Sequence, residues 1–120
     1  MWLGGDGPLA PRLRQAAQSP ALAGRVQFLG VLDAAARRQR LLACDVVAVP
    51  SLRLPDGRTE GAPQVVLEAL AAGCPLVVSQ VGGIPELLGQ AGWLVADADP
   101  EAWATTLATA LSAATATPDA

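Results

Sequence analysis

The stretch from Thr59 to Pro75 reads Thr-Glu-Gly-Ala-Pro-Gln-Val-Val-Leu-Glu-Ala-Leu-Ala-Ala-Gly-Cys-Pro, and the rest of the chain is organised around it. Pro63 suits the first position of a helix, where its missing N–H costs no hydrogen bond. The alanine-rich residues that follow favour a helix, Gly73 can end it, and Pro75 prevents its continuation. We therefore expect a helix that starts at Pro63 and stops at Gly73.

This helix is apolar on nearly every side. Around Glu68 stand Val65, Val66, Leu67, Ala69 and Leu70. A helix that is hydrophobic all round is typical of a buried position. A single Glu in a helix is most often a solvated surface residue, but a carboxylate in buried surroundings needs a partner. The pattern therefore makes Glu68 a candidate binding residue.

Glu60 precedes Glu68 by eight positions and lies just before the predicted start of the helix. The unpaired N–H groups around Gly61, Ala62 and Gln64 form a natural anion site. In the simpler interpretation, Glu60 is a loop residue whose charge the helix dipole favours. In the functional interpretation, both carboxylates accept hydrogen bonds from the hydroxyls of a sugar or ribose, and the amides between them hold a phosphate. We favour the second.

The remaining chain predicts an α/β fold. Apolar strands are expected at 2–3, 26–29, 45–49, 75–79 and 92–95, and helices at 9–18, 33–43, 63–72, 84–88 and from 100 onward. Residues 51–59 are read as polar loop. Strands without polar alternation, separated by helices, indicate a Rossmann-like three-layer parallel sheet with helices on both faces. The domain is expected to cover 1–112, with a frayed Ala/Thr-rich tail at 113–120.

Ligands of such sheets bind beyond the carboxyl ends of the strands. The loops expected there are 4–8, 30–33, 50–62 and 80–83. The first contains Gly-Asp-Gly-Pro-Leu-Ala at 5–10, a G-x-G-x-x-A pattern. Pro8 removes an amide where phosphate would dock, and no acidic residue ends the second strand. We interpret residues 5–10 as a glycine turn beside a nucleotide site rather than as a dinucleotide fingerprint.

Composition excludes several classes of function. The chain of 120 residues has a net charge of −3 and no Lys, so it lacks the basic surface that nucleic-acid-binding proteins use. It contains no His, which rules out His-dependent catalytic triads and ordinary His metal sites within this chain. No apolar run approaches the roughly 20 residues that span a bilayer.

Two cysteines, Cys44 and Cys74, flank apolar strands without metal-ligand spacing. We expect both to be buried and reduced, as in a cytoplasmic protein. Peripheral association of the full-length parent with a membrane is left open.

Residues 60–77 resemble the E-x7-E segment of retaining GT-B-type glycosyltransferases, the family 4 "glycosyl transferases group 1" domain. Five further segments agree in order: Gly5-Asp6-Gly7-Pro8, Val26-Gln27-Phe28-Leu29-Gly30, Ala43-Cys44-Asp45-Val46, Val49-Pro50-Ser51 and Gly82-Gly83-Ile84-Pro85-Glu86. The resemblance extends from Leu3 to about Leu111.

The resemblance implies a nucleotide-sugar donor bound by the C-terminal half of a GT-B fold, and transfer of its sugar with retention. Glu60 would contact the transferred sugar as the catalytic residue, and Glu68 the ribose. The amides of residues 61–65, which include Gly61, Ala62, Gln64 and Val65, would approach the diphosphate, and Leu32 would contact the base. No metal or other cofactor is implied.

The chain lacks parts that the resemblance implies. By resemblance, an Arg and a Lys that neutralise the diphosphate would precede Met1, as would an N-terminal acceptor-binding domain. We therefore expect an N-terminally truncated fragment that cannot transfer sugar alone. Two alternatives remain: a non-catalytic nucleotide-binding or interaction module, and a nucleotide-sugar epimerase of GT-B architecture.

Overall fold

The computed structural model describes residues 1–5, 7–50, 52–53, 59–60, 63–80, 92–96 and 99–116. The chain divides into two compact units, Met1–Arg37 and Arg38–Ala120, and the division falls within a helix. The turn expected at Gly82-Gly83 and the short helix expected at 84–88 lie outside the described residues.

The first unit is built on two parallel strands, β1 (Trp2–Gly4) and β2 (Gln27–Gly30). The helix α1 (Ala10–Ala16) connects them. The helix α2 (Ala34–Ala43) follows β2. Its N-terminus is capped as predicted, because the Oδ1 atom of Asp33 accepts a hydrogen bond of 2.8 Å from the N–H of Ala36. The β-α-β-α order expected for this part of the chain is confirmed.

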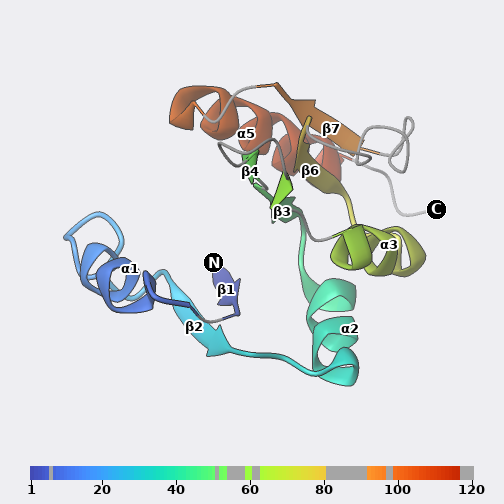
Figure 1. Ribbon diagram of the computed structural model, residues 1–120. Helices are drawn as coiled ribbons and strands as arrows, with labels where there is room; N and C mark the ends of the chain where they lie inside the picture. The colour runs from blue at the N-terminus through green and yellow to red at the C-terminus, as the bar shows by residue number, and fades with distance from the viewer. Residues whose placement is uncertain are drawn as a thin grey trace. The chain divides into compact units, whose positions relative to one another are not determined.

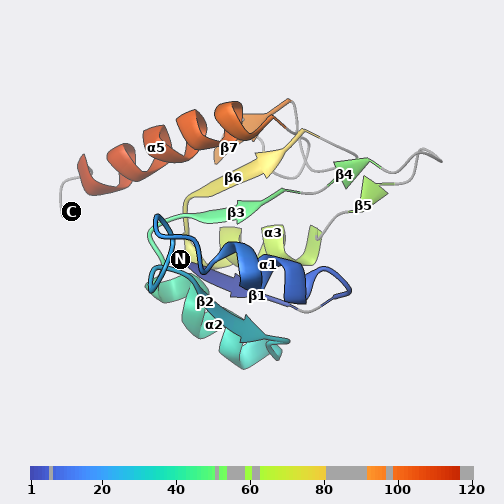
Figure 2. The ribbon, with the colours of Figure 1, turned by 90° about the vertical axis from the view of Figure 1, so that its left-hand side faces the viewer.

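The second unit contains a parallel sheet in the order β3-β6-β7 (Figure 1). Its strands are β3 (Val47–Val49), β6 (Leu76–Ser79) and β7 (Gly92–Val95). The helix α3 (Pro63–Ala72) connects β3 to β6 along the chain, and α5 (Pro100–Ala116) follows β7. Figure 2 shows α3 on one side of this sheet and α5 on the other. Together they form the helix-sheet-helix layers that the apolar strands predicted.

Successive side chains of the central strand β6 pack alternately into two hydrophobic cores, one on each face of the sheet. Leu76 and Val78 pack toward Val66 and Ala69 of α3, whereas Val77 packs with Val95 and Ala110 on the α5 side. Side chains of successive strand residues point to opposite faces, so a strand covered on both faces must be apolar at every position. Complete burial of Leu76, Val77 and Val78 contributes about 1.5–3 kcal/mol for each side chain.

The helix α3 begins and ends where the sequence predicted. Pro63 is its first residue, and Gly73 follows its last with a φ of +71°. The N–H of Gly73 donates to the carbonyl of Leu70 (3.1 Å), and the N–H of Cys74 donates to that of Ala69 (3.0 Å). These two bonds form a Schellman motif, which satisfies carbonyls left open at the helix end.

The predicted loop 51–59 needs correction at its ends. Two short strands, β4 (Leu52–Arg53) and β5 (Thr59–Glu60), pair antiparallel, with Leu52 opposite Glu60. Strands of two residues are too short to show an alternating pattern, and main-chain hydrogen bonds hold such a pair regardless of side-chain type.

Two predicted bounds also shift. The strand expected from residue 45 begins at Val47, since the main-chain pairing with Leu76 starts there. The tail expected to fray after residue 112 continues the helix α5 to Ala116. Alanine, which occupies three of the five positions 112–116, favours a helix.

The expectation that α3 is buried nearly all round is wrong, because Gln64, Leu67 and Ala71 are exposed. Leu67 is 52% exposed, although Val66 beside it is fully buried. One side of α3 packs on the sheet through Val66 and Ala69, and Leu67 does not belong to that core. Sequence hydrophobicity alone does not distinguish these two neighbours.

Candidate functional site

In the second unit, the carboxyl ends of β3 and β6 lie side by side. Val49, the last residue of β3, pairs with Val78. The next residue, Ser79, is buried, and its hydroxyl donates to the carbonyl of Val49 at 3.5 Å. The N–H of Gln80 donates to the carbonyl of Val95 at the end of β7 (2.9 Å). The segments that follow these strands therefore leave the sheet from one edge, where ligands of parallel sheets bind.

Ser79 was not among the predicted site residues. A polar residue that ends an otherwise apolar strand run was the available sequence signal. Its side chain joins the ends of β3 and β6 at the expected binding edge.

Glu60 reaches this edge by way of the hairpin. The chain leaves β3 at Val49, passes through β4, and returns in β5, whose last residue is Glu60. Two residues, Gly61 and Ala62, separate β5 from the first residue of α3, and both lie outside the described residues. The main chain thus has Glu60 directly before the start of α3, as the sequence predicted.

Three predicted site residues lie on α3. Gln64, in the first turn, is exposed, and Val65 is partly buried against the core that includes Val66 and Ala69. Glu68 lies one turn further along and is half-buried. A half-buried carboxylate keeps access to solvent while being held by a rigid helix, which suits a residue that binds hydroxyl groups.

Leu32 belongs to the first unit. The N–H of Gly5, just after β1, donates to the carbonyl of Gly30 at the end of β2 (2.7 Å). Leu32 follows β2 and is half-buried, and its Cδ1 atom lies 3.4 Å from the position that a side chain on Gly4 would occupy. Its carbonyl accepts a hydrogen bond of 2.7 Å from Arg37. The loops after β1 and β2 thus lie together at the carboxyl edge of that sheet, as predicted.

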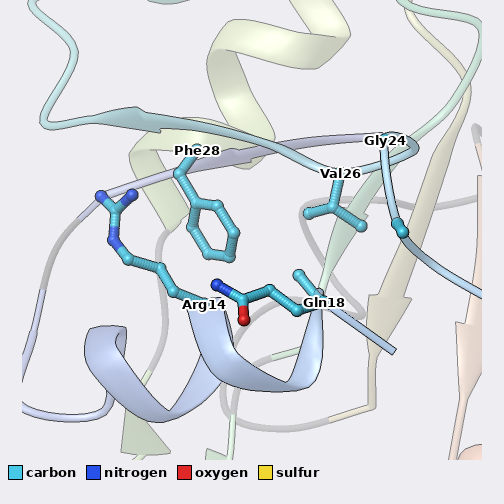
Figure 3. Close-up of a pocket in the computed structure, with 7 residues that line it drawn as sticks. Arg14, Gln18, Gly24, Val26 and Phe28 are labelled. Carbon is cyan, nitrogen blue, oxygen red and sulfur yellow. The ribbon is translucent and has the colours of Figure 1, made fainter. Parts of the chain in front are cut away.

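The first unit also contains a pocket of about 390 Å³ between α1 and β2 (Figure 3). The guanidinium of Arg14 lies 4.7 Å from the centre of the Phe28 ring, a cation–π distance. Gln18 and Val26 also line it. None of the predicted site residues contributes to this pocket, and we assign no function to it.

The two cysteines form a cluster that sequence spacing did not reveal. Their Sγ atoms lie 3.0 Å apart although the residues are thirty positions apart. Both are free thiols; Cys74 is buried as expected, but Cys44 is only half-buried. The pKa of the Cys74 thiol is raised from 9.0 to about 12, first by burial and then by the hydrogen bond and charge of the adjacent Cys44.

Within the described residues, no three His, Cys, Asp or Glu side chains are placed to hold a metal ion together. In the same part of the chain, no helix combines the length and apolar character required to cross a membrane.

The sequence matches the family described as "Glycosyl transferases group 1" over residues 1–113. It is 37% identical over 106 residues to the putative colanic acid biosynthesis glycosyltransferase WcaL of Salmonella typhimurium, covering 87% of this chain and 26% of that protein. It is 35% identical to the amylovoran biosynthesis glycosyltransferase AmsK of Erwinia amylovora, covering 86% of this chain and 26% of AmsK. The chain therefore spans about a quarter of the length of these relatives.

Solved structures show the same fold. HepE of Anabaena, solved in complex with UDP-glucose, superposes with a TM-score of 0.73 at 26% identity, over 95% of this chain and 35% of HepE. AviGT4, a glycosyltransferase involved in avilamycin A biosynthesis, gives a TM-score of 0.63 at 19% identity, over 98% of this chain and 34% of AviGT4, and so shares the fold. The predicted α/β fold class of GT-B glycosyltransferases is confirmed, and the chain belongs to the group 1 glycosyltransferase family.

Proposed function

We propose that this chain is the donor-binding part of a glycosyltransferase that moves a sugar from a nucleoside-diphosphate sugar to an acceptor, with retention of configuration. The observation that carries the proposal is the likeness to HepE, whose structure contains UDP-glucose and which matches nearly the whole of this chain. The carboxyl edge formed by β3 and β6 is the place where the fold would present such a ligand.

Each predicted residue has a role in this proposal. Glu60, at the end of β5, contacts hydroxyls of the transferred sugar, and Glu68 on α3 contacts the ribose. The N–H groups from Gly61 to Val65 face the diphosphate, whose negative charge grows as the sugar leaves, so fixed donors there stabilise the transition state. Leu32 lies against the base. The chemistry needs no metal ion for donor binding.

The acceptor is bound by a part of the full-length protein outside this chain. The support for this step is that the relatives are about four times as long as their match to this chain. On this proposal the isolated chain binds donor but does not transfer sugar. The full-length protein is cytoplasmic, with peripheral membrane association left open.

Calorimetric titration of the purified chain tests donor binding. UDP-glucose is titrated first, followed by GDP and ADP sugars, with glucose alone as the control for the nucleotide. Saturable binding of one nucleotide sugar, and none of glucose, is the expected result. Absence of saturation by every nucleotide sugar at millimolar concentration contradicts the proposal and favours a non-catalytic interaction module.

A further inference from the structure

The thiol pair of Cys44 and Cys74 is the one cluster of reactive side chains in the described residues that the proposed donor site does not use. Cys44 directly follows α2, and Cys74 directly follows the Gly73 turn that ends α3. Their Sγ atoms are 3.0 Å apart, and a disulfide requires about 2.05 Å, so closure needs a movement of about 1 Å. Rotation of two short side chains can supply such a movement.

The backbone holds both residues in place. The N–H of Cys44 donates to the carbonyl of Arg40 at 2.9 Å, and the N–H of Cys74 donates to that of Ala69 at 3.0 Å. A third bond, from the N–H of Val47 to the carbonyl of Pro75 at 2.9 Å, joins the two segments directly beside the thiols. The sulfurs are therefore held against each other by the fold, without any contribution from a ligand.

From this geometry we infer that Cys44 and Cys74 form a redox-active dithiol, which a small-molecule disulfide such as oxidised glutathione converts to an intramolecular disulfide. The bridge would enclose residues 45–73, the segment that carries Glu60 and Glu68. The inference rests on the thiol geometry and does not require the chain to bind a nucleotide sugar.

The reaction proceeds in two exchanges. Cys44, the more exposed thiol, loses its proton and attacks one sulfur of the oxidised glutathione, which releases one glutathione and leaves the other bound to Cys44. Cys74 then loses its proton and attacks the Sγ atom of Cys44, releasing the second glutathione. Two cysteine thiols are oxidised to one disulfide, and one glutathione disulfide is reduced to two thiols.

The surroundings of Cys74 favour this order. Burial first, then the hydrogen bond and charge of Cys44, and last the carboxylate of Asp45 raise the pKa of Cys74, while the N–H of Val47 lowers it. Cys74 is therefore a poor first nucleophile. Cys74 therefore acts second, on a sulfur that already lies 3.0 Å from its own.

The test exposes the purified chain to oxidised glutathione in mildly alkaline buffer and follows intact mass and free thiols. Wild type is expected to lose both thiols and two hydrogens, without retaining glutathione or forming dimers, and dithiothreitol is expected to restore both thiols. Cys74→Ser is expected to retain one glutathione on Cys44. Cys44→Ser is expected to react roughly tenfold more slowly than Cys74→Ser, because its remaining thiol is buried.

Three results would overturn the inference. The first is wild type that retains glutathione and forms no internal bridge. The second is wild type that keeps both thiols or crosslinks between chains. The third is a Cys44 thiol that fails to react in both wild type and Cys74→Ser. The oxidation of the wild-type chain and its reversal by dithiothreitol decide the question without the variants. The test therefore holds even if a variant does not fold.

Discussion

Gly73 shows how one residue determines where an element ends. Its φ of +71° lies in the left-handed region, and no heavy atom lies within 4 Å of the position that a Cβ would occupy. Gly73→Ala therefore costs backbone strain without steric overlap, and we expect the free energy of unfolding to fall by about 1–2 kcal/mol. Urea denaturation of the reduced chain measures this.

Gly7→Ala is the matched control for that variant. Gly7 also has open space around its Cβ position, but its φ lies outside the left-handed region. We expect its effect on stability to stay within about 0.5 kcal/mol. Equal losses in the two variants would show that the left-handed turn at Gly73 does not account for the cost.

Cys74 gives the reduced protein a specific response to alkaline pH. Its pKa is raised to about 12 in the folded chain, mainly by burial, against an ordinary value of 9.0. Between these values the unfolded chain releases the thiol proton and the folded chain keeps it, so the free energy of unfolding falls as pH rises from 9.0 toward 12. Below pH 9.0 the thiol is protonated in both states and contributes no pH dependence.

Chemical denaturation at several alkaline pH values, with reductant present, measures this response. Cys74→Ala removes the titrating group and is expected to reduce the slope of stability against pH. Other groups that ionise in this range are common to both proteins. An unchanged slope in the variant would assign the alkaline loss of stability to those other groups.

At the scale of the element, α3 contains a matched pair of apolar neighbours in opposite environments. Val66 is fully buried between the helix and β6, whereas Leu67 is 52% exposed. Val66→Ala removes two buried methyl groups, so we expect a loss of about 2 kcal/mol from transfer and cavity effects. Leu67→Ala should change the stability of this chain by less than about 0.5 kcal/mol.

Denaturation midpoints of the two variants compare the two faces of α3. The ranking is the decisive result, because Leu is the larger residue and would cost more if both positions were equally buried. A greater loss for Leu67→Ala than for Val66→Ala would contradict the packing of α3 on β6.

At the scale of the whole molecule, the proposed roles of Glu60 and Glu68 require the full-length protein. Glu60→Gln removes the charge but keeps the shape, and we expect a strong fall in kcat with donor affinity largely kept. Glu68→Ala is expected to weaken donor binding by about 1–3 kcal/mol, which is roughly 5- to 150-fold in Kd. Steady-state kinetics and calorimetric titration of the full-length variants separate the two effects.

Asp45→Ala is the control for loss of a carboxylate. Asp45 is exposed and precedes β3, at the opposite edge of the sheet from the proposed site. Its removal should leave kcat and Kd near those of wild type. Near-normal turnover of Glu60→Gln would exclude Glu60 from the chemistry, and equal effects of Asp45→Ala and Glu68→Ala would show that the loss of binding is nonspecific.

The sequence by itself determined the elements whose signals are local. Pro63 and Gly73 mark the two ends of α3, Asp33 caps α2, and the uninterrupted apolar run of β6 reflects a strand with helices on both faces. These signals depend on backbone geometry or on the period of hydrophobicity, which neighbouring residues alone express. The motifs around Glu60 and Glu68 likewise indicated the family to which the chain belongs.

Only the tertiary structure decided which residues distant in sequence meet. It paired Leu52 with Glu60 in a hairpin, joined Ser79 to Val49 across two strand ends, and brought Cys44 within 3.0 Å of Cys74. It also exposed Leu67 while burying Val66. Such contacts arise from the register of strands and the face on which a helix packs. A sequence read residue by residue carries no direct record of either, because both result from the packing of whole elements.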